Sequence, residues 1–152
     1  MFFGGGHEHG FRPGTIPTAL IAGLGEACRI AGKEYADNLK KYEETKELIY
    51  QLLDRSRISF SVNGERKFCI PNTLNIRIVG MNSIALIKQC KPFCGISNGS
   101  ACNTNIGKPS HVLKAMGFSD EHTEQSLRIS WGNKPFDQED FVHLLDVAKG
   151  WT

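Results

Sequence analysis

The chain has 152 residues, with 18 basic and 16 acidic side chains and a formal net charge of +2 at pH 7. This length is sufficient for one globular domain with its own hydrophobic core. The interspersed charges give no reason to expect nucleic acid or a membrane as a direct partner, and no apolar run approaches the length of a membrane span.

The five cysteines are expected to be reduced thiols in the cytoplasm. The first ten residues lack the basic start and the apolar stretch of a signal peptide, and an odd number of cysteines argues against a closed disulfide framework. Cys90 and Cys94 are spaced C-x3-C, but no second Cys/His pair stands at zinc-finger spacing. His7 and His9 lack a third ligand. No metal site is therefore predicted.

Two helices are predicted in the first third of the chain. Residues 1–16 are rich in Gly and His, and no regular element is expected there. Pro17 opens a helix that Gly32 ends, and a longer helix follows. Apolar residues at helical spacing mark the buried faces of these two helices. They are Leu20, Ile21, Leu24, Ala27, Cys28 and Ala31 in the first, and Tyr35, Leu39, Tyr42, Ile49 and Leu53 in the second.

Alternating apolar residues predict strands in the middle of the chain. Ile58, Phe60 and Val62 mark the first strand, and a second follows Pro71. Its buried residues are Leu74, Ile76 and Ile78. "NSIALIKQC" is predicted to be a short helix, and "PFCGIS" a strand that leads into a polar loop.

Helices and strands continue to alternate towards the end. A helix begins near Ser110, with Val112, Leu113 and Met116 as its apolar residues, and ends at Gly117. Leu127, Ile129 and Trp131 mark a further strand. Asp137 caps a last helix that ends at Gly150, with Phe141, Leu144, Leu145 and Ala148 on its buried face. The pattern predicts a two-layer α+β domain, with helices packed on one face of a small sheet.

Cys102 differs from the other cysteines because its neighbours are small and polar, in "SNGSACNTNIG". A thiol there is expected to be exposed, so its ionisation depends on neighbouring groups. Lys108, His111 and the start of the helix near Ser110 are three candidates to favour the nucleophilic thiolate. An ordinary surface cysteine remains the alternative at this point. Cys28 and Cys69 are expected to be core residues, and Cys90 and Cys94 to be structural.

Several motifs together resemble one protein family. "SNGSAC", "PSHVLKAMG" and "SLRISWG" resemble the C-terminal region of cysteine desulfurases, pyridoxal-phosphate enzymes related to class V aminotransferases. "GGGHEHGFRPGT" and "IAGLGEA" resemble the segment after the cofactor lysine of that family, and "PNTLNI" also matches in place. The resemblance implies the C-terminal small domain of a fold-type I enzyme. Its loop 1–16 would form part of the active site and dimer contact, and residues 17–152 would form the domain.

The resemblance implies roles for individual residues. Cys102 matches the cysteine that takes sulfur from L-cysteine as a persulfide, leaving alanine, and residues 96–108 would form its mobile loop. Arg128 matches the arginine that binds the substrate α-carboxylate, which its planar fork suits. Thr15 matches the residue that contacts the cofactor phosphate of the neighbouring subunit. His7, Arg12 and Ser100 are expected to support the site.

The cofactor-binding part of the family has no counterpart in the chain. No segment matches its cofactor lysine, and Lys33, Lys40 and Lys46 are expected on a solvated helix face. The large domain would precede Met1. We therefore expect the chain to be inactive without a pyridoxal-phosphate-binding half or parent chain, and the complete enzyme to be a homodimer. His122 and His143 are expected to be ordinary surface residues.

Three alternatives remain open from the sequence. "RPGT" and "IAGLG" also resemble selenocysteine lyases. A truncated relative could instead be a non-catalytic module that carries a persulfide or binds a scaffold, or a partial sequence without a function of its own. The sulfur acceptor is equally open among iron–sulfur scaffolds, tRNA thiolation and sulfur modification of DNA, because a fold does not select among them.

Overall fold

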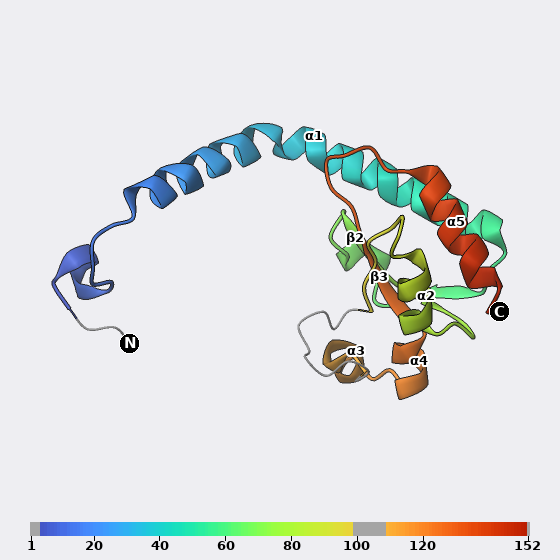
Figure 1. Cartoon of the computed structure of the whole chain (residues 1–152). Coiled ribbons are helices and arrows are strands. Elements are labelled where there is room, and N and C mark those ends of the chain that lie inside the picture. Colours follow the sequence, from blue (N-terminus) through green and yellow to red (C-terminus); the bar gives the residue numbers. More distant parts are fainter. Residues whose placement is uncertain (1–3, 99–108, 152) are drawn as a thin grey trace. The chain divides into compact units, whose positions relative to one another are not determined.

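The structure is a computed structural model that describes residues 4–98 and 109–151 (Figure 1). It divides into two compact units, Met1–Asp37 and Asn38–Thr152. None of the helices in the described ranges is long and apolar enough to cross a membrane.

Helix α1 is one continuous helix of 39 residues, Thr18–Ser56, so the prediction of two helices separated at Gly32 is wrong. A single glycine costs a helix only about 1 kcal/mol, which strong helix formers on both sides can offset. Leu20 and Leu24 are 74% and 65% exposed, and Cys28 is exposed rather than part of a core. The spacing of apolar residues identified a face of the helix correctly, but could not show whether anything covers it.

Three antiparallel strands form a sheet in the order β1-β2-β3: Phe60–Val62, Thr73–Ile78 and Ser126–Ser130. The predicted alternation is confirmed, since the apolar side chains of β2 and β3 are buried on one face. The expected strand at "PFCGIS" is absent, and only Ser97 forms an isolated bridge, with Arg128. Proline lacks an N–H for a strand ladder, and glycine weakens a strand.

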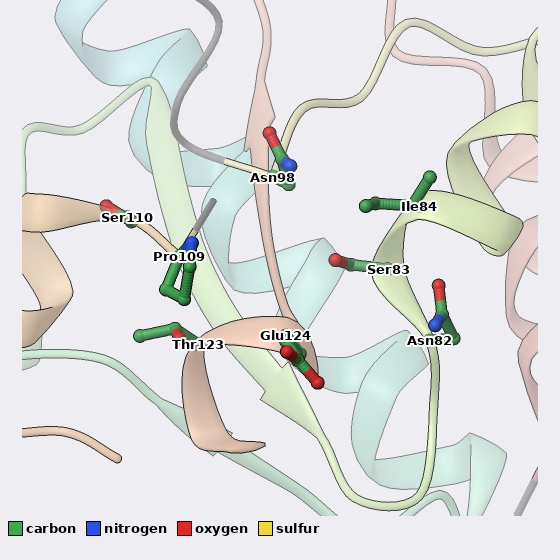
Figure 2. A pocket seen from close by; sticks show the side chains of 8 residues that line it. All are labelled: Asn82, Ser83, Ile84, Asn98, Pro109, Ser110, Thr123 and Glu124. Carbon is green, nitrogen blue, oxygen red and sulfur yellow. The ribbon is translucent and has the colours of Figure 1, made fainter. Parts of the chain in front are cut away.

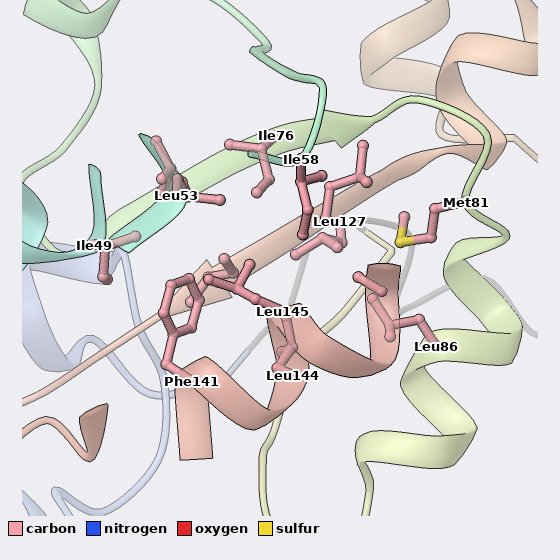
Figure 3. Close-up of a cluster of buried hydrophobic side chains, with 14 of the residues drawn as sticks. Ile49, Leu53, Ile58, Ile76, Met81, Leu86, Leu127, Phe141, Leu144 and Leu145 are labelled. Carbon is pink, nitrogen blue, oxygen red and sulfur yellow. The ribbon is translucent and has the colours of Figure 1, made fainter. Parts of the chain in front are cut away.

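Helices cover the apolar face of the sheet, which confirms the predicted α+β class (Figure 3). Besides the second half of α1, these are α2, Ser83–Cys90, and α5, Gln138–Lys149. Asp137 caps α5 as predicted, since its carboxylate accepts from the N–H groups of Glu139 and Asp140 at 3.0 and 3.1 Å. The largest fully buried side chains are Ile49, Leu53, Leu74, Ile76, Ile78, Met81, Leu86, Leu127 and Leu144.

Two helices of five residues each precede β3. They are α3, His111–Ala115, which begins near Ser110 as predicted and is capped by that serine, and α4, Asp120–Glu124, capped by Ser119. Only Leu113 of the predicted apolar residues of α3 is buried. The sequence "DEHTE" of α4 has no apolar period, so its helix depends on the serine cap and was not predicted.

Two 3-10 turns complete the described elements: η1, His7–Gly10, and η2, Arg66–Phe68. Glu8 and His9 of η1 have non-helical backbone angles, so η1 is an irregular turn and does not contradict the expectation of no regular element in the first 16 residues.

Candidate functional site

The N-terminal loop carries three of the predicted site residues, all of them exposed: His7, Arg12 and Thr15. Glu8 and His9 adopt positive φ angles of 54°, which side chains other than glycine rarely adopt. The Arg12 guanidinium donates to the carbonyl oxygens of Gly14 and Thr15 at 3.2 and 3.4 Å. Arg12 thereby holds the backbone of Gly14 and Thr15, shortly before α1, and Thr15 itself is exposed.

Arg128 lies in the middle of β3, on the face of the sheet opposite the apolar core. Its neighbours along the strand, Leu127 and Ile129, point into the core, so the half-buried Arg128 side chain leaves the other face. On β2 it is paired with Asn75. On its other side Arg128 N donates to Ser97 O at 2.5 Å, and Ser97 N donates to Arg128 O at 3.1 Å.

The two arginines of this polar face differ in their partners. Arg77 donates to Gln125 at 2.7 Å and forms an ion pair with Glu121 at 3.5 Å. The Arg128 guanidinium makes no hydrogen bond or ion pair within the described residues. A half-buried guanidinium without such a partner is suited to bind an external anion.

A hydrogen-bonded network of side chains lies beside Arg128 on the same face. Asn63 Nδ2 donates to Asn75 Oδ1 at 2.7 Å and to Ser126 Oγ at 2.9 Å. The Ser126 hydroxyl donates its only hydrogen to the His122 carbonyl at 2.7 Å, so it can only accept from Asn63. Asn63 Oδ1 therefore faces His122 Nε2, 2.6 Å away, and this nitrogen must carry a hydrogen.

His122 is not the ordinary surface residue that was expected. It is half-buried, its ring stacks on Phe118 with centroids 4.1 Å apart, and Arg77 Nη1 lies 3.5 Å from its Nδ1. Burial, and then the charge of Arg77, lower the pKa of His122. The sequence held no signal for this network, since its members come from four separate segments.

A cavity of about 170 Å³ is lined on one side by Asn98, Pro109 and Ser110 (Figure 2). The start of α2 and the end of α4 complete its wall. Cys102 and Ser100, the predicted nucleophile and a supporting residue, belong to the segment outside the described residues. Cys102 is five positions along the chain from Ser97, which pairs with Arg128. The segment that contains Cys102 therefore begins two positions after the residue that pairs with Arg128.

The other cysteines have different surroundings. Cys90 is fully buried, and Cys94 is half-buried with a pKa raised to about 11, mainly by burial. A thiol with such a pKa is almost wholly protonated at neutral pH and reacts poorly as a nucleophile. Cys69 is half-buried, and its thiol lies 3.4 Å from the Glu65 carbonyl. These features agree with structural roles for Cys90 and Cys94.

The three lysines considered above, Lys33, Lys40 and Lys46, differ in their burial. Lys33 and Lys40 are exposed as expected, whereas Lys46 is buried, which corrects its predicted place on a solvated face. The Lys46 amine donates to the carbonyls of Cys69 and Ile70, both at 3.3 Å, and so ties α1 to the following loop. A Schiff base needs an amine that is free to react. Among the described side chains no group of His, Cys, Asp or Glu could hold a metal ion.

No family model matches the chain, but individual proteins do. It is 37% identical over 136 residues to the cysteine desulfurase IscS of Neisseria meningitidis serogroup A, a match that covers 90% of this chain and 33% of that protein. A NifS-like protein from Rickettsia africae has a similar fold, with a TM-score of 0.80, 24% identity and coverage of 99% and 39%. DndA from Streptomyces lividans has a TM-score of 0.66 and 32% identity, with coverage of 87% and 36%. The chain thus spans about a third of the length of the curated relatives it matches.

Proposed function

This chain is a homologue of the cysteine desulfurases over about a third of their length, and we propose that it supplies the sulfur-accepting part of such an enzyme. In this proposal it takes sulfur from L-cysteine and delivers it to an acceptor protein. The single observation that carries the proposal is Arg128: a half-buried guanidinium without an internal partner in the described residues, in the strand residue that pairs with Ser97, five positions before Cys102.

Arg128 would bind the α-carboxylate of L-cysteine. Its fork of N–H donors matches the two oxygens of a carboxylate, and its position at mid-strand holds it in place. The bound substrate would then present its sulfur to a nucleophile on the neighbouring segment.

Cys102 would be that nucleophile. Its thiolate attacks the substrate sulfur and forms the new S–S bond of a persulfide, while the carbon–sulfur bond breaks. The electron pair of the broken bond passes to the substrate carbon, which takes up a proton and leaves as alanine. The outer sulfur of the persulfide then passes to a thiolate of an acceptor protein, and the thiol of Cys102 is restored.

The cofactor would be held mainly by a part of the enzyme that the described residues do not provide. Pyridoxal phosphate supplies the electron sink for breaking the carbon–sulfur bond when it is bound in the complete enzyme. Thr15, beside the backbone held by Arg12, would contribute a hydrogen bond to its phosphate in a neighbouring subunit of a dimer. His7 and Ser100 would support the two loops. The lysine would come from a complementing half.

Sulfur acceptance tests the proposal directly on this chain. The chain is incubated with a small-molecule persulfide, and the modified peptides are identified by mass spectrometry. We expect one added sulfur at Cys102 and much less at Cys28, which is also exposed and therefore controls for simple accessibility. Cys102→Ser should abolish the main product. Equal labelling of both cysteines would contradict a dedicated acceptor.

A further inference from the structure

Asn75 is the residue of β2 that lies directly opposite Arg128. Both are half-buried, and both alternate with side chains of the core: Leu74 and Ile76 on one strand, Leu127 and Ile129 on the other. Residues paired across two antiparallel strands have Cβ atoms about 4.5–5.5 Å apart and share one face. The Asn75 amide and the Arg128 guanidinium therefore leave the sheet side by side.

The hydrogen-bond network determines which end of the Asn75 amide remains available. Asn63 has to use Nδ2 as the donor, since the Ser126 hydroxyl can only accept from it. Its second bond, at 2.7 Å, therefore requires the oxygen of Asn75 to face Asn63. The nitrogen of the Asn75 amide then points away from Asn63, and its two N–H groups have no partner in the described part of the chain.

We propose that Asn75 and Arg128 form one carboxylate-binding site, in which the Asn75 amide nitrogen and the guanidinium donate to the same carboxylate. This inference rests on the proposed function, which assigns the substrate carboxylate to Arg128, and it adds a second binding residue. The ligand is the carboxylate of an amino acid.

The composition of this face favours an anionic ligand, whose oxygens accept hydrogen bonds. The strand residues that share the face with Arg128 are Ser61, Thr73, Asn75, Arg77, Ser126 and Ser130, and none of them is acidic. The nearby Glu121 forms an ion pair with Arg77. With the Asn75 oxygen occupied by Asn63, the pair presents only N–H donors, and a carboxylate supplies the acceptors that these donors require.

Asn63 acts in this site as a positioning residue. Its side chain is 6% exposed, and His122 holds its oxygen while its nitrogen holds Asn75. Without that bond the Asn75 amide could rotate and offer its oxygen to Arg128. The arginine would then have an internal partner in place of the ligand.

Nuclear magnetic resonance on the ¹⁵N-labelled full chain tests the inference. The chain is titrated with sodium acetate, and in a parallel experiment with sodium chloride at the same ionic strength, so that general charge effects can be subtracted. We expect the Asn75 side-chain amide and the Arg128 Nε–H signals to shift together and to give one dissociation constant. A shift of Arg128 without Asn75 would overturn the second residue and leave the proposed function intact. Absence of both shifts would contradict the carboxylate role of Arg128 as well.

Asn75→Asp is the decisive variant, because it retains an oxygen for Asn63 but replaces the amide donors with a negative charge opposite Arg128. We expect acetate binding at least about ten-fold weaker, as for the loss of a charge-assisted hydrogen bond. Thr73→Ala, at the next outward-facing position of β2, is the matched control and should bind as the unmodified chain does. Unchanged affinity in Asn75→Asp would overturn the inference.

The positioning role of Asn63 is tested by a double-mutant cycle in acetate affinity. As a single substitution, Asn63→Ala should weaken acetate binding. Combined with Asn75→Asp it should cause little further loss of affinity, because both substitutions act through the same amide. Fully additive losses would show that Asn63 acts independently and would overturn this part of the inference.

Discussion

Arg77 and Arg128 share one face of the sheet, but only Arg77 has internal partners among the described residues. If Arg128 binds the substrate carboxylate, its removal should impair the enzyme specifically in its use of L-cysteine. In an enzyme completed by a cofactor-binding half, we expect Arg128→Gln to lower kcat/KM for L-cysteine about ten- to a hundred-fold, since hydrogen bonds to charged groups contribute about 1.5–3 kcal/mol. Steady-state alanine formation measures this. The Arg77→Gln variant is the control, and an equal loss in it would contradict a specific role.

His122 predicts a pH dependence of stability. Its pKa in the folded chain lies below the ordinary value of 6.5, because burial and Arg77 disfavour the charged ring. The unfolded chain therefore binds the proton more readily, and the free energy of unfolding should fall as the pH falls below about 6.5. Above that pH the contribution of His122 to the free energy of unfolding is constant.

Denaturant unfolding between pH 5 and pH 8 measures the effect. His122→Gln, which can still donate to Asn63, should reduce the loss of stability at acid pH, whereas the exposed His111→Gln should not. A pH profile that is identical in all three proteins would show that His122 is not the group responsible.

Local sequence points to some residues of the polar face and not to others. Arg128 and Thr15 were proposed as site residues because they stand in local motifs that resemble a known family, and their roles stay predictions. The Asn63–His122 pair joins residues 59 positions apart, and the hydrogen bond becomes apparent only when the fold brings them together. Lys46 was misplaced for the same reason, since its partners are carbonyls 23 and 24 positions away.

At the scale of elements, alternating apolar residues predicted strands most reliably, because alternate side chains on β2 and β3 point into the same core. Helix ends were less predictable. Gly32 has the signature of a helix end, but it lies inside α1, where a Cβ would meet no atom within 4 Å. Local sequence could not distinguish a tolerated glycine from a terminating one.

Gly32→Ala tests the continuity of α1. Alanine should favour the helix by about 0.5–1 kcal/mol, since it restricts the unfolded chain without a steric clash. We expect slower amide exchange in the turns around residue 32 and unchanged exchange in α5. Faster exchange around residue 32 would indicate that the helix ends there.

At the scale of the whole molecule, the first half of α1 carries several exposed apolar residues. Ile21, Leu24 and Tyr35 are 50%, 65% and 67% exposed. Apolar surface of this kind favours association in water. We predict that the isolated chain self-associates in sedimentation experiments, and that Leu20→Gln combined with Leu24→Gln reduces this. A strictly monomeric unmodified chain would contradict the prediction.

The central proposal is that this chain carries the cysteine that receives sulfur from L-cysteine, but depends on another part of the enzyme to bind the cofactor. The most direct test measures alanine from L-cysteine, with pyridoxal phosphate and a reductant present, in three samples: the chain alone, the chain with the cofactor-binding segment of a relative, and that mixture with Cys102→Ala. Alanine is expected in the second sample only. Alanine from the chain alone would contradict the claim, because this chain would then hold a cofactor site of its own.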